Sequence, residues 1–271
     1  MHNLKNIFLI FCILTTGFYT HAADKEKILI TGSSTIAPLM MELARVYEKK
    51  HSDIQIDVQT GGSTKGIVDQ RKHISDLGMV SRALKANESD LKGYLIARDG
   101  LGIIVNKSNP LKNITHQQVI DIYLGKINNW KQLGGSDQPI VVVHKADGRS
   151  TQEIFLKYFQ LKNSQVKANI IIGDNEQGIK TVSGNKYSIG YVSVGTAQYN
   201  ESAGIPIKTL SLDGKIASVE NVKEKTYPLA RELNIVAAGN KNNAIEDFLK
   251  FALSKEVSPI VKQYYFIPPG E

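Results

Sequence analysis

The chain has 271 residues, of which 42% are hydrophobic and 22% charged, and its formal net charge is +7 at neutral pH. This length is enough for one large domain or two smaller ones, each with its own core. Basic residues are scattered as single and paired lysines without an aromatic-interleaved patch, which argues against a nucleic-acid-binding protein. A modest positive excess instead favours the approach of small anions.

The first 22 residues have the pattern of a signal peptide. Lys5 supplies the positive start, Ile7 to Leu14 the apolar core, and Thr20-His21-Ala22 a cleavage site. Removal of residues 1–22 on export would lower the charge from +7 to +6, because Lys5 leaves. No other run approaches the roughly 20 apolar residues that span a bilayer. The single cysteine, Cys12, lies in this segment, so we expect neither a disulfide nor a cysteine metal site in the mature chain.

The stretch from Thr31 to Thr35 joins an apolar run to an amphipathic one. Residues 27–30 predict a strand, whereas apolar residues between Ile36 and Tyr47 recur with the spacing of a helix that buries one face. A strand that turns through Gly-Ser-Ser-Thr into a helix presents free backbone N–H groups, hydroxyls and the positive end of the helix dipole. This turn favours anion binding, although serine and threonine also act as ordinary helix N-caps.

The same strand, turn and helix arrangement recurs. Residues 54–58 alternate as a strand and continue through Gly61-Gly62-Ser63 into a short helical run. Leu77 to Val80 predicts a buried strand that ends at Ser81, and residues 102–106 predict another strand before a turn. Because ligands bind at the carboxyl ends of strands in open α/β sheets, the polar groups after these strands are candidates for one site.

A second lobe is predicted after residue 105. The apolar run 139–143 predicts a buried strand that leads through Gly148-Arg149-Ser150-Thr151 into a helix. The remaining predicted elements are strands at 169–172, 188–192 and 227–236 and a closing helix at 244–253.

Both halves of the chain begin with a strand, an anion-type turn and a helix, and this repetition predicts the domain organisation. We predict a signal peptide (1–22), a first lobe (23–105 plus 226–271) and a second lobe (106–225). Two α/β lobes joined by crossing strands place their turns face to face across a cleft, which is then the expected site.

Turns that donate hydrogen bonds to one point fit an oxyanion, because removing its water is costly unless every oxygen finds a partner. Other chemistry fits less well. A nucleophile elbow requires glycine where Lys65 stands, and a P-loop requires lysine where Ile179 stands. The histidines, among them His144, lack metal-ligand spacing and are expected at the surface or at caps, and Trp130 is expected in the core. We predict no metal, no cofactor and no catalysis.

These ordered motifs resemble those of the phosphate-binding periplasmic proteins that deliver their ligand to ABC importers. The landmarks span nearly the whole mature chain and are residues 32–35, 61–63, 76–82, 121–130, 188–193 and 227–231. The resemblance implies an α/β periplasmic-binding-protein fold of class II type, whose two lobes close on a ligand in a central cleft.

In the first lobe, the resemblance implies that Ser34 donates its hydroxyl and Thr35 its backbone N–H. Ser63 would donate from the second turn, and Ser81 would contact phosphate from a strand end. Some family members have an aspartate where Ser81 stands, whose carboxylate accepts a proton from HPO4²⁻ and repels sulfate. Serine accepts more weakly and carries no charge, so phosphate is favoured while sulfate or another oxyanion stays open.

The second-lobe turn departs from the family pattern. The family usually has Gly-Ser-Gly-Thr after a basic residue, whereas this chain has Gly148-Arg149-Ser150-Thr151 with Lys145 at the earlier basic position. Thr151 matches the pattern, and Ser150 is expected to restore the displaced hydroxyl. Arg149 is expected to bind the ligand, since a cation at the positive end of a helix dipole gains nothing without one. We therefore predict a larger contribution from Arg149 than from Lys145.

The expected function is the capture of inorganic phosphate, or a similar oxyanion, by an exported monomeric protein of the periplasm. The ligand would pass to the membrane permease of an ABC importer. An extracytoplasmic phosphate sensor or a surface-adhesion protein on the same fold stays open as the alternative, and neighbouring permease and ATPase genes would favour transport.

Overall fold

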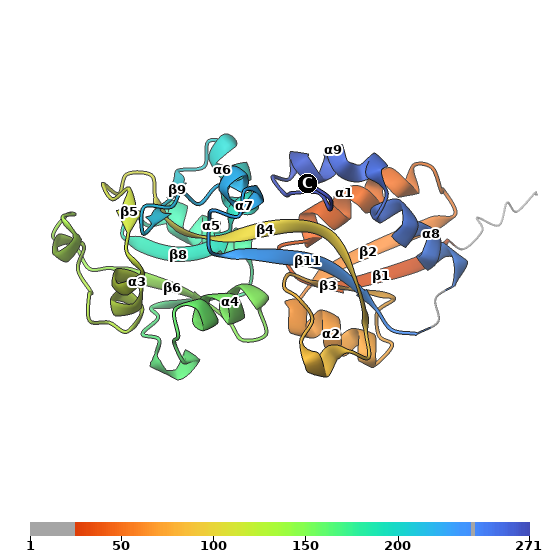
Figure 1. Cartoon of the computed structure of the whole chain (residues 1–271), viewed down its shortest axis with the longest axis horizontal. Helices are drawn as coiled ribbons and strands as arrows, with labels where there is room; N and C mark the ends of the chain where they lie inside the picture. Colours follow the sequence, from red (N-terminus) through yellow and green to blue (C-terminus); the bar gives the residue numbers. More distant parts are fainter. Residues whose placement is uncertain (1–24, 240–241) are drawn as a thin grey trace, which may run out of the picture.

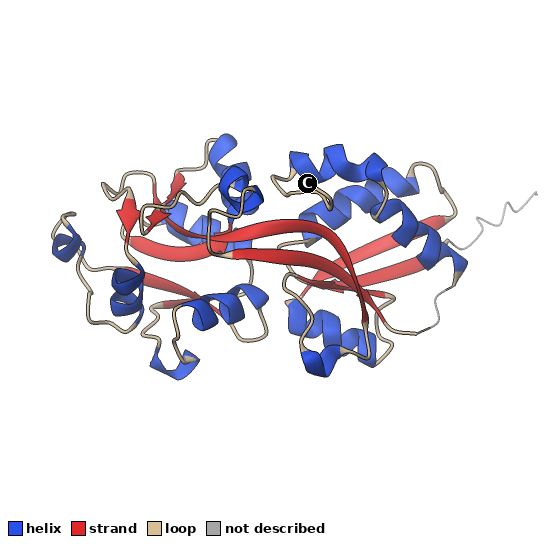
Figure 2. Ribbon diagram, viewed as in Figure 1, coloured by secondary structure: helices blue, strands red, loops and turns tan. Residues whose placement is uncertain are grey.

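The computed structural model describes residues 25–239 and 242–271, so the predicted signal peptide lies outside the described residues. Figures 1 and 2 show an elongated molecule of two α/β lobes, connected by two long strands. Within the described residues, none of the helices has the length and apolar character needed to span a membrane. The two-lobed α/β architecture expected from the sequence is confirmed.

The first lobe is built from parallel strands that alternate with helices. β1 (Glu26–Gly32) pairs in parallel with β2 (Ile54–Thr60) on one side and with β3 (Leu77–Val80) on the other. α1 (Ala37–Glu48) follows β1, and α2 (Ser63–Arg71) follows β2. Because the strands are parallel, their carboxyl ends meet at one edge, where both helices begin.

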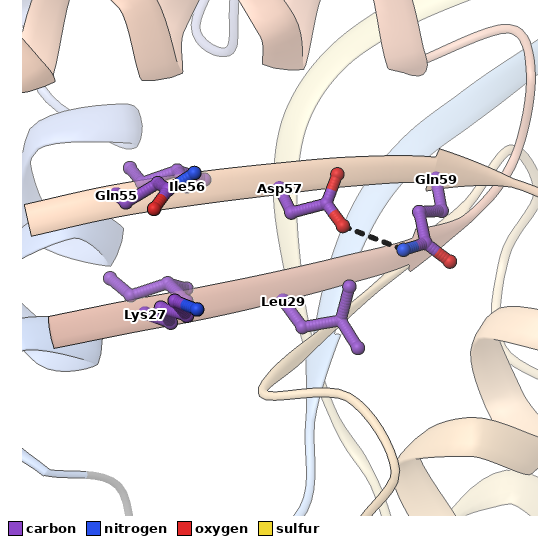
Figure 3. A pocket seen from close by; sticks show the side chains of 7 residues that line it. Lys27, Leu29, Gln55, Ile56, Asp57 and Gln59 are labelled. Carbon is purple, nitrogen blue, oxygen red and sulfur yellow. Dashed lines mark hydrogen bonds between the residues drawn. The ribbon is translucent and has the colours of Figure 1, made fainter. Parts of the chain in front are cut away.

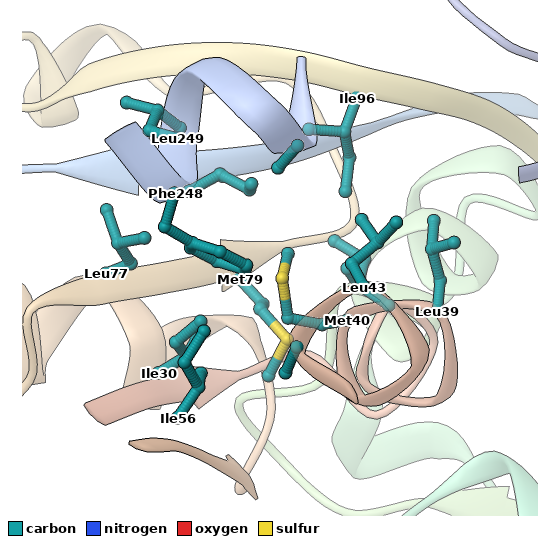
Figure 4. Packing of buried hydrophobic residues seen from close by; sticks show 14 of the residues in the cluster. Ile30, Leu39, Met40, Leu43, Ile56, Leu77, Met79, Ile96, Phe248 and Leu249 are labelled. Atoms are coloured by element: carbon teal, nitrogen blue, oxygen red, sulfur yellow. The ribbon is translucent and has the colours of Figure 1, made fainter. Parts of the chain in front are cut away.

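The core of the first lobe uses residues from both ends of the chain. α8 (Asn243–Ala252) and α9 (Ser258–Gln263) lie beside α1 in Figure 1. Figure 4 shows Phe248 of α8 packed with Met79 of β3 and Met40 of α1, all fully buried. The closing helix predicted from periodicity therefore fixes the helix that carries the first anion-type turn.

Two antiparallel strands connect the lobes. β4 (Lys92–Asn106) pairs with β11 (Ala230–Ala237) through Lys92 to Gly100, and its residues 101–105 continue onto β8 (Ser188–Ser193). The sequence predicted only residues 102–106 of β4, because Arg98 and Asp99 interrupt its apolar pattern.

The second lobe continues the same sheet. β8 pairs in parallel with β6 (Val141–Lys145), and β6 pairs in parallel with β7 (Ile170–Ile172). The strand order is therefore β2-β1-β3-β11-β4-β8-β6-β7, and β9 (Ile207–Thr209) also pairs with β4. α4 (Ser150–Tyr158) follows β6, and α5 (Asn175–Gly184) follows β7. The smaller elements are β5 (Asn113–Ile114), α3 (His116–Tyr123), α6 (Val194–Ser202), β9 (Ile207–Thr209), β10 (Ser211–Leu212) and α7 (Val219–Lys223).

Along the two crossing strands, the buried residues pass from the core of the first lobe to the core of the second lobe. Ala97 of β4 and Leu233 of β11 belong to the first-lobe core, whereas Leu101 and Leu229 belong to the second-lobe core. We propose that the lobes meet between residues 97 and 101 and between residues 229 and 233, a few residues from the predicted boundaries at 105/106 and 225/226.

Candidate functional site

A small cavity lies between the lobes, where the carboxyl ends of strands meet helix N-termini. The residues predicted to bind ligand all line it, and they are Ser34, Thr35, Ser63, Ser81, Arg149, Ser150 and Thr151. Four further lining residues were not among the predicted binding residues, namely Ser33, Gly62, Lys145 and Gly173. The structure therefore brings the predicted set together, while the part each residue plays in binding stays a prediction.

Two glycines allow the turns to approach one another. The carbonyl of Gly32 accepts hydrogen bonds from the N–H groups of Gly61 and Gly62, both at 2.9 Å. A Cβ on Gly32 (φ +135°) would lie 2.3 Å from the Met79 carbonyl oxygen, and one on Gly62 (φ +92°) would lie 2.5 Å from Arg149 Nη1. Only glycine fits both positions without a shift of its neighbours. The close contact between the lobes thus depends on Gly62.

The helices that begin at the cavity have no side-chain N-cap. α1, α2 and α4 lack a cap hydrogen bond, whereas Thr115, Asp174 and Asn242 cap α3, α5 and α8. The cavity serines and threonines therefore do not serve as the ordinary caps of these helices. Some first-turn N–H groups are already used, since Thr64 of α2 donates to the Gly148 carbonyl and Ala37 of α1 to the Ser33 carbonyl. The positive ends of the three helix dipoles add positive potential at the cavity.

Hydrogen bonds within the first lobe fix two of the predicted donors. Ser63 Oγ accepts from the Ser81 N–H at 3.1 Å and lies 3.5 Å from Ser81 Oγ, a contact in which either hydroxyl can donate. The N–H of Thr35, expected to face the ligand, donates to Ser33 Oγ at 3.2 Å. The hydroxyl of Thr35 is therefore the donor that this residue has left for a ligand.

Arg231 of β11 connects the two sides of the cavity. Its guanidinium pairs with Asp99 Oδ2 at 2.7 and 2.9 Å, and both side chains are 1% exposed. It also donates to Thr151 Oγ1 of the second lobe at 2.8 Å and to Thr35 Oγ1 of the first lobe at 3.2 Å. Thr35 Oγ1 accepts a second hydrogen bond from Asn175 at 3.1 Å, so both its lone pairs are used and it can only donate further.

Sequence reasoning missed Arg231 as part of the site. The available clue was a pair of opposite charges inside two strands that otherwise bury apolar residues. Asp99 and Arg231 face each other in the register of β4 and β11, and that pairing is not visible without the sheet.

Lys145 is the buried cation of the cavity. It is 2% exposed, and its Nζ has no hydrogen-bond partner within residues 25–239 and 242–271. Burial, and after it the charge of Arg231, lowers the pKa of Lys145 to about 7. Arg149 differs, since its Nε donates to the Gly173 carbonyl. Because its Nζ is unpaired in the described residues, we propose Lys145 as the main cation for a ligand, in place of the Arg149 expected from the sequence.

His144 lies in the core, so the expectation from the sequence of a surface or cap position was wrong for this residue. It is 2% exposed and hydrogen-bonds to Tyr191 and Asn163. In the described part of the chain, no three His, Cys, Asp or Glu residues are grouped so as to hold a metal ion. Trp130 is buried, as predicted, and its Nε1 donates to the Tyr187 carbonyl.

A separate depression lies on β1 and β2, away from the lobe interface (Figure 3). Lys27, Leu29 and Gln55 line it together with Asp57 and Gln59, which hydrogen-bond to each other at 2.6 Å. Asp57 would repel an anion, and no helix N-terminus contributes to the lining. This depression lacks the features of the interlobe cavity and is not a second anion site.

Comparison with known proteins assigns the family. The profile of the PBP superfamily domain matches residues 19–256. The chain belongs to this superfamily. Among PBP proteins, it is 29% identical to the phosphate-binding protein PstS of Borreliella burgdorferi, over 97% of this chain and 98% of that protein.

Two solved structures of PBP type extend this similarity. A candidate phosphate ABC transporter substrate-binding protein from Clostridium perfringens, solved with bound phosphate, has a TM-score of 0.83 and 34% identity over 90% of this chain and 99% of that one. An ABC-type phosphate transport receptor from Vibrio cholerae has a TM-score of 0.71 and 31% identity over 89% of this chain and 100% of that one. The predicted resemblance to phosphate-binding proteins of the PstS type is confirmed.

Proposed function

We propose that this chain is an exported solute-binding protein that captures phosphate between its lobes and delivers it to an ABC importer. The observation that carries the proposal is the interlobe cavity, whose lining residues offer hydrogen-bond donors from both lobes and include no carboxylate. The names of the PstS relative and of the two solved structures support phosphate as the ligand and an importer as the partner.

The donors suit a small tetrahedral oxyanion. Hydroxyls, first-turn N–H groups and the Lys145 ammonium offer hydrogens, and an oxyanion stripped of water requires a donor at each oxygen. Among the described residues that line the cavity, none is a histidine or a carboxylate. This donor set supports the binding and release of an oxyanion.

Several hydrogen bonds cross directly between the lobes. The Thr64 N–H donates to the Gly148 carbonyl at 3.2 Å, and Asn175 of α5 donates to Thr35. A ligand that contacts both lobes stabilises this closed arrangement, since only closure unites its donors. Opening of the lobes would then release phosphate at the permease.

The proposed location of the protein in the cell rests on its sequence. The signal-peptide pattern of residues 1–22 supports export of the mature chain to the periplasm, where we propose that it acts as a monomer. The relatives are named for phosphate binding and phosphate transport, which favours delivery over the sensor or adhesion alternative. Permease and ATPase genes beside this one would distinguish the two.

Calorimetric titration of the ligand-free mature chain tests the proposal. Phosphate is expected to bind with one site per chain near neutral pH. Sulfate is titrated alone and in competition, because no carboxylate lines the cavity to repel it. If sulfate saturates the protein at a lower concentration than phosphate does, sulfate is the ligand instead of phosphate. If neither anion gives heat, the proposed function is wrong.

A further inference from the structure

A buried polar chain lies behind the cavity, on the opposite face of β6 from Lys145. The hydroxyl of Tyr191 in β8 lies 2.8 Å from His144 Nδ1, and His144 Nε2 lies 2.9 Å from Asn163 Oδ1. Asn163 Nδ2 donates to Asp147 Oδ1 at 2.9 Å, at the exposed end of the chain. None of these four residues lines the cavity.

The hydrogen bonds require one tautomer of His144. A carboxylate only accepts, so Asn163 turns its amide nitrogen to Asp147 and its oxygen to the histidine. His144 Nε2 must then carry the hydrogen, and Nδ1 accepts from the Tyr191 hydroxyl. Burial also lowers the pKa of His144, which favours the neutral ring.

The same chain holds both peptide groups of Lys145. The Lys145 N–H donates to the Tyr191 hydroxyl oxygen at 3.3 Å. The Lys145 carbonyl accepts from Gln152 Nε2 at 2.9 Å, and that nitrogen also lies 3.2 Å from Asn163 Oδ1. The backbone that carries the buried ammonium is therefore fixed through groups bonded to His144.

We propose that His144 is a positioning residue of the anion site, whose neutral ring holds the Lys145 backbone and whose protonation weakens phosphate binding at acidic pH. A proton on Nδ1 would meet the Tyr191 oxygen and force the tyrosine hydrogen away. Tyr191 is 2% exposed, so its hydrogen would have no water to bond. The inference rests on the proposed function.

The groups that face His144 decide the direction of this effect. α3 and β8 contribute the rings of Tyr123 and Tyr191, and α4 contributes the uncharged Phe155. The charged groups nearby are Asp147, which favours protonation, and Lys145, which opposes it. With burial added, the ring stays neutral near pH 7 and takes up a proton only below its ordinary range.

The first test compares phosphate dissociation constants of wild type and His144→Gln in steps from about pH 7.5 down through and below the ordinary range of histidine. Protonation of phosphate and of Lys145 also changes the affinity over this range, but both act on the two proteins and cancel in the comparison. On acidification, the affinity of the wild type is expected to fall roughly tenfold more than that of the variant, since a difference of one pKa unit corresponds to a tenfold change in an equilibrium constant. Equal losses, or a larger loss in the variant, would overturn the inference.

A matched pair of tyrosine variants guards against misfolding of the histidine variant. Tyr191→Phe keeps the ring stacked on Phe155 and removes the hydroxyl that joins His144 to Lys145. It is expected to bind phosphate about threefold to tenfold more weakly at pH 7.5, as for one lost hydrogen bond, and to lose less on acidification. Tyr227→Phe removes a buried hydroxyl bonded to the Leu101 carbonyl, with no link to Lys145, and should match the wild type.

Nitrogen-15 spectra of the wild type test the network without substitution. The Nε2–H tautomer of His144 is expected, with titration shifted toward acid. An Nδ1–H tautomer would overturn the inference even if phosphate binds. If the wild type binds no phosphate near pH 7.5, the proposed function fails first, and the two failures are therefore distinguishable.

Discussion

The two walls of the cavity supply different kinds of interaction. The first-lobe wall offers neutral donors, and Ser63 there is already hydrogen-bonded to Ser81. The second-lobe wall carries the cations Lys145 and Arg149 together with Ser150, whose buried Oγ has no partner in the described residues. The first wall is thus organised before a ligand arrives, whereas the second has unmet polar groups. An anion should therefore gain more free energy from the second wall.

The largest effect is expected where the crossing strands join these walls. Asp99 accepts from Arg231 through Oδ2 and from the Gly195 N–H through Oδ1 at 3.1 Å. Asp99→Asn would leave Arg231 as an uncompensated buried cation, which costs about 3–5 kcal/mol of unfolding free energy. Urea unfolding of the ligand-free protein measures this loss.

The matched control for that variant is Asp69→Asn. Asp69 is also buried and paired, but its partner Lys65 is 40% exposed and can be solvated by water when the pair is broken. A loss for Asp99→Asn no larger than the loss for Asp69→Asn would show that the buried pair does not hold the two walls together.

Lys145→Met tests the charged wall. The methionine fills similar space without a charge, and an anion left without its buried partner loses about 2–5 kcal/mol of binding free energy, or roughly 30-fold or more in affinity. Lys208→Met is the control, because Lys208 of the same lobe donates to the Asn109 carbonyl outside the cavity. Titration of Arg149→Met in parallel ranks the two cations. A larger loss for Arg149→Met would restore the order expected from the sequence.

The pH dependence of binding should report the same lysine. Its pKa of about 7 in the ligand-free protein means that binding above pH 7 requires proton uptake, so affinity should fall as pH rises, by up to about tenfold per unit. Stability of the ligand-free protein should move the other way. From pH 7 to about 10.4 the unfolded chain holds a proton that the folded chain lacks, so this contribution to stability rises with pH. Both trends should be absent in Lys145→Met.

Two serine variants separate the walls more finely. Ser63→Ala removes the acceptor of the Ser81 N–H and should lower both stability and phosphate affinity, each by about 1 kcal/mol. Ser150→Ala removes an unpartnered buried hydroxyl, so it should weaken phosphate binding by a similar amount while leaving the ligand-free protein as stable or more stable. Thermal unfolding with and without phosphate measures both quantities. Identical behaviour of the two variants would contradict the difference between the walls.

How far the sequence predicts this molecule depends on the range of the interaction. The strand, turn and helix units around Ser34, Ser63 and Thr151 depend on local periodicity and turn chemistry, and the structure places all of them at one cavity. The full length of β4 was not predicted, because a buried strand tolerates the charge of Asp99 only where Arg231 of the neighbouring strand pairs with it. The sequence alone does not show that pairing. The proposal of Lys145 in place of Arg149 likewise rests on a contact that the sequence does not show, since Arg149 donates to the carbonyl of Gly173, 24 residues further along the chain.

The smallest effect is expected from an ion pair at the margin of the lobe contact. Glu153 of α4 lies 2.6 Å from Lys85 Nζ and 3.2 Å from Arg82 Nε, both of the first lobe. Because Lys85 is 49% exposed, the pair is worth at most about 1 kcal/mol, and Glu153→Gln should weaken phosphate binding by no more than about fivefold. High salt should remove the difference from the wild type.

Small-angle scattering separates closure from binding in this variant. Without phosphate, Glu153→Gln should be at least as extended as the wild type, since it lacks an attraction between the lobes, and saturating phosphate should contract both to the same size. Glu256→Gln is the matched control, because Glu256 forms an exposed pair at 2.6 Å with Lys50, within the first lobe. Equal effects of the two substitutions on affinity would mean that the Glu153 pair is ordinary surface charge, and closure would then rest on Arg231 and the neutral contacts between Thr35 and Asn175.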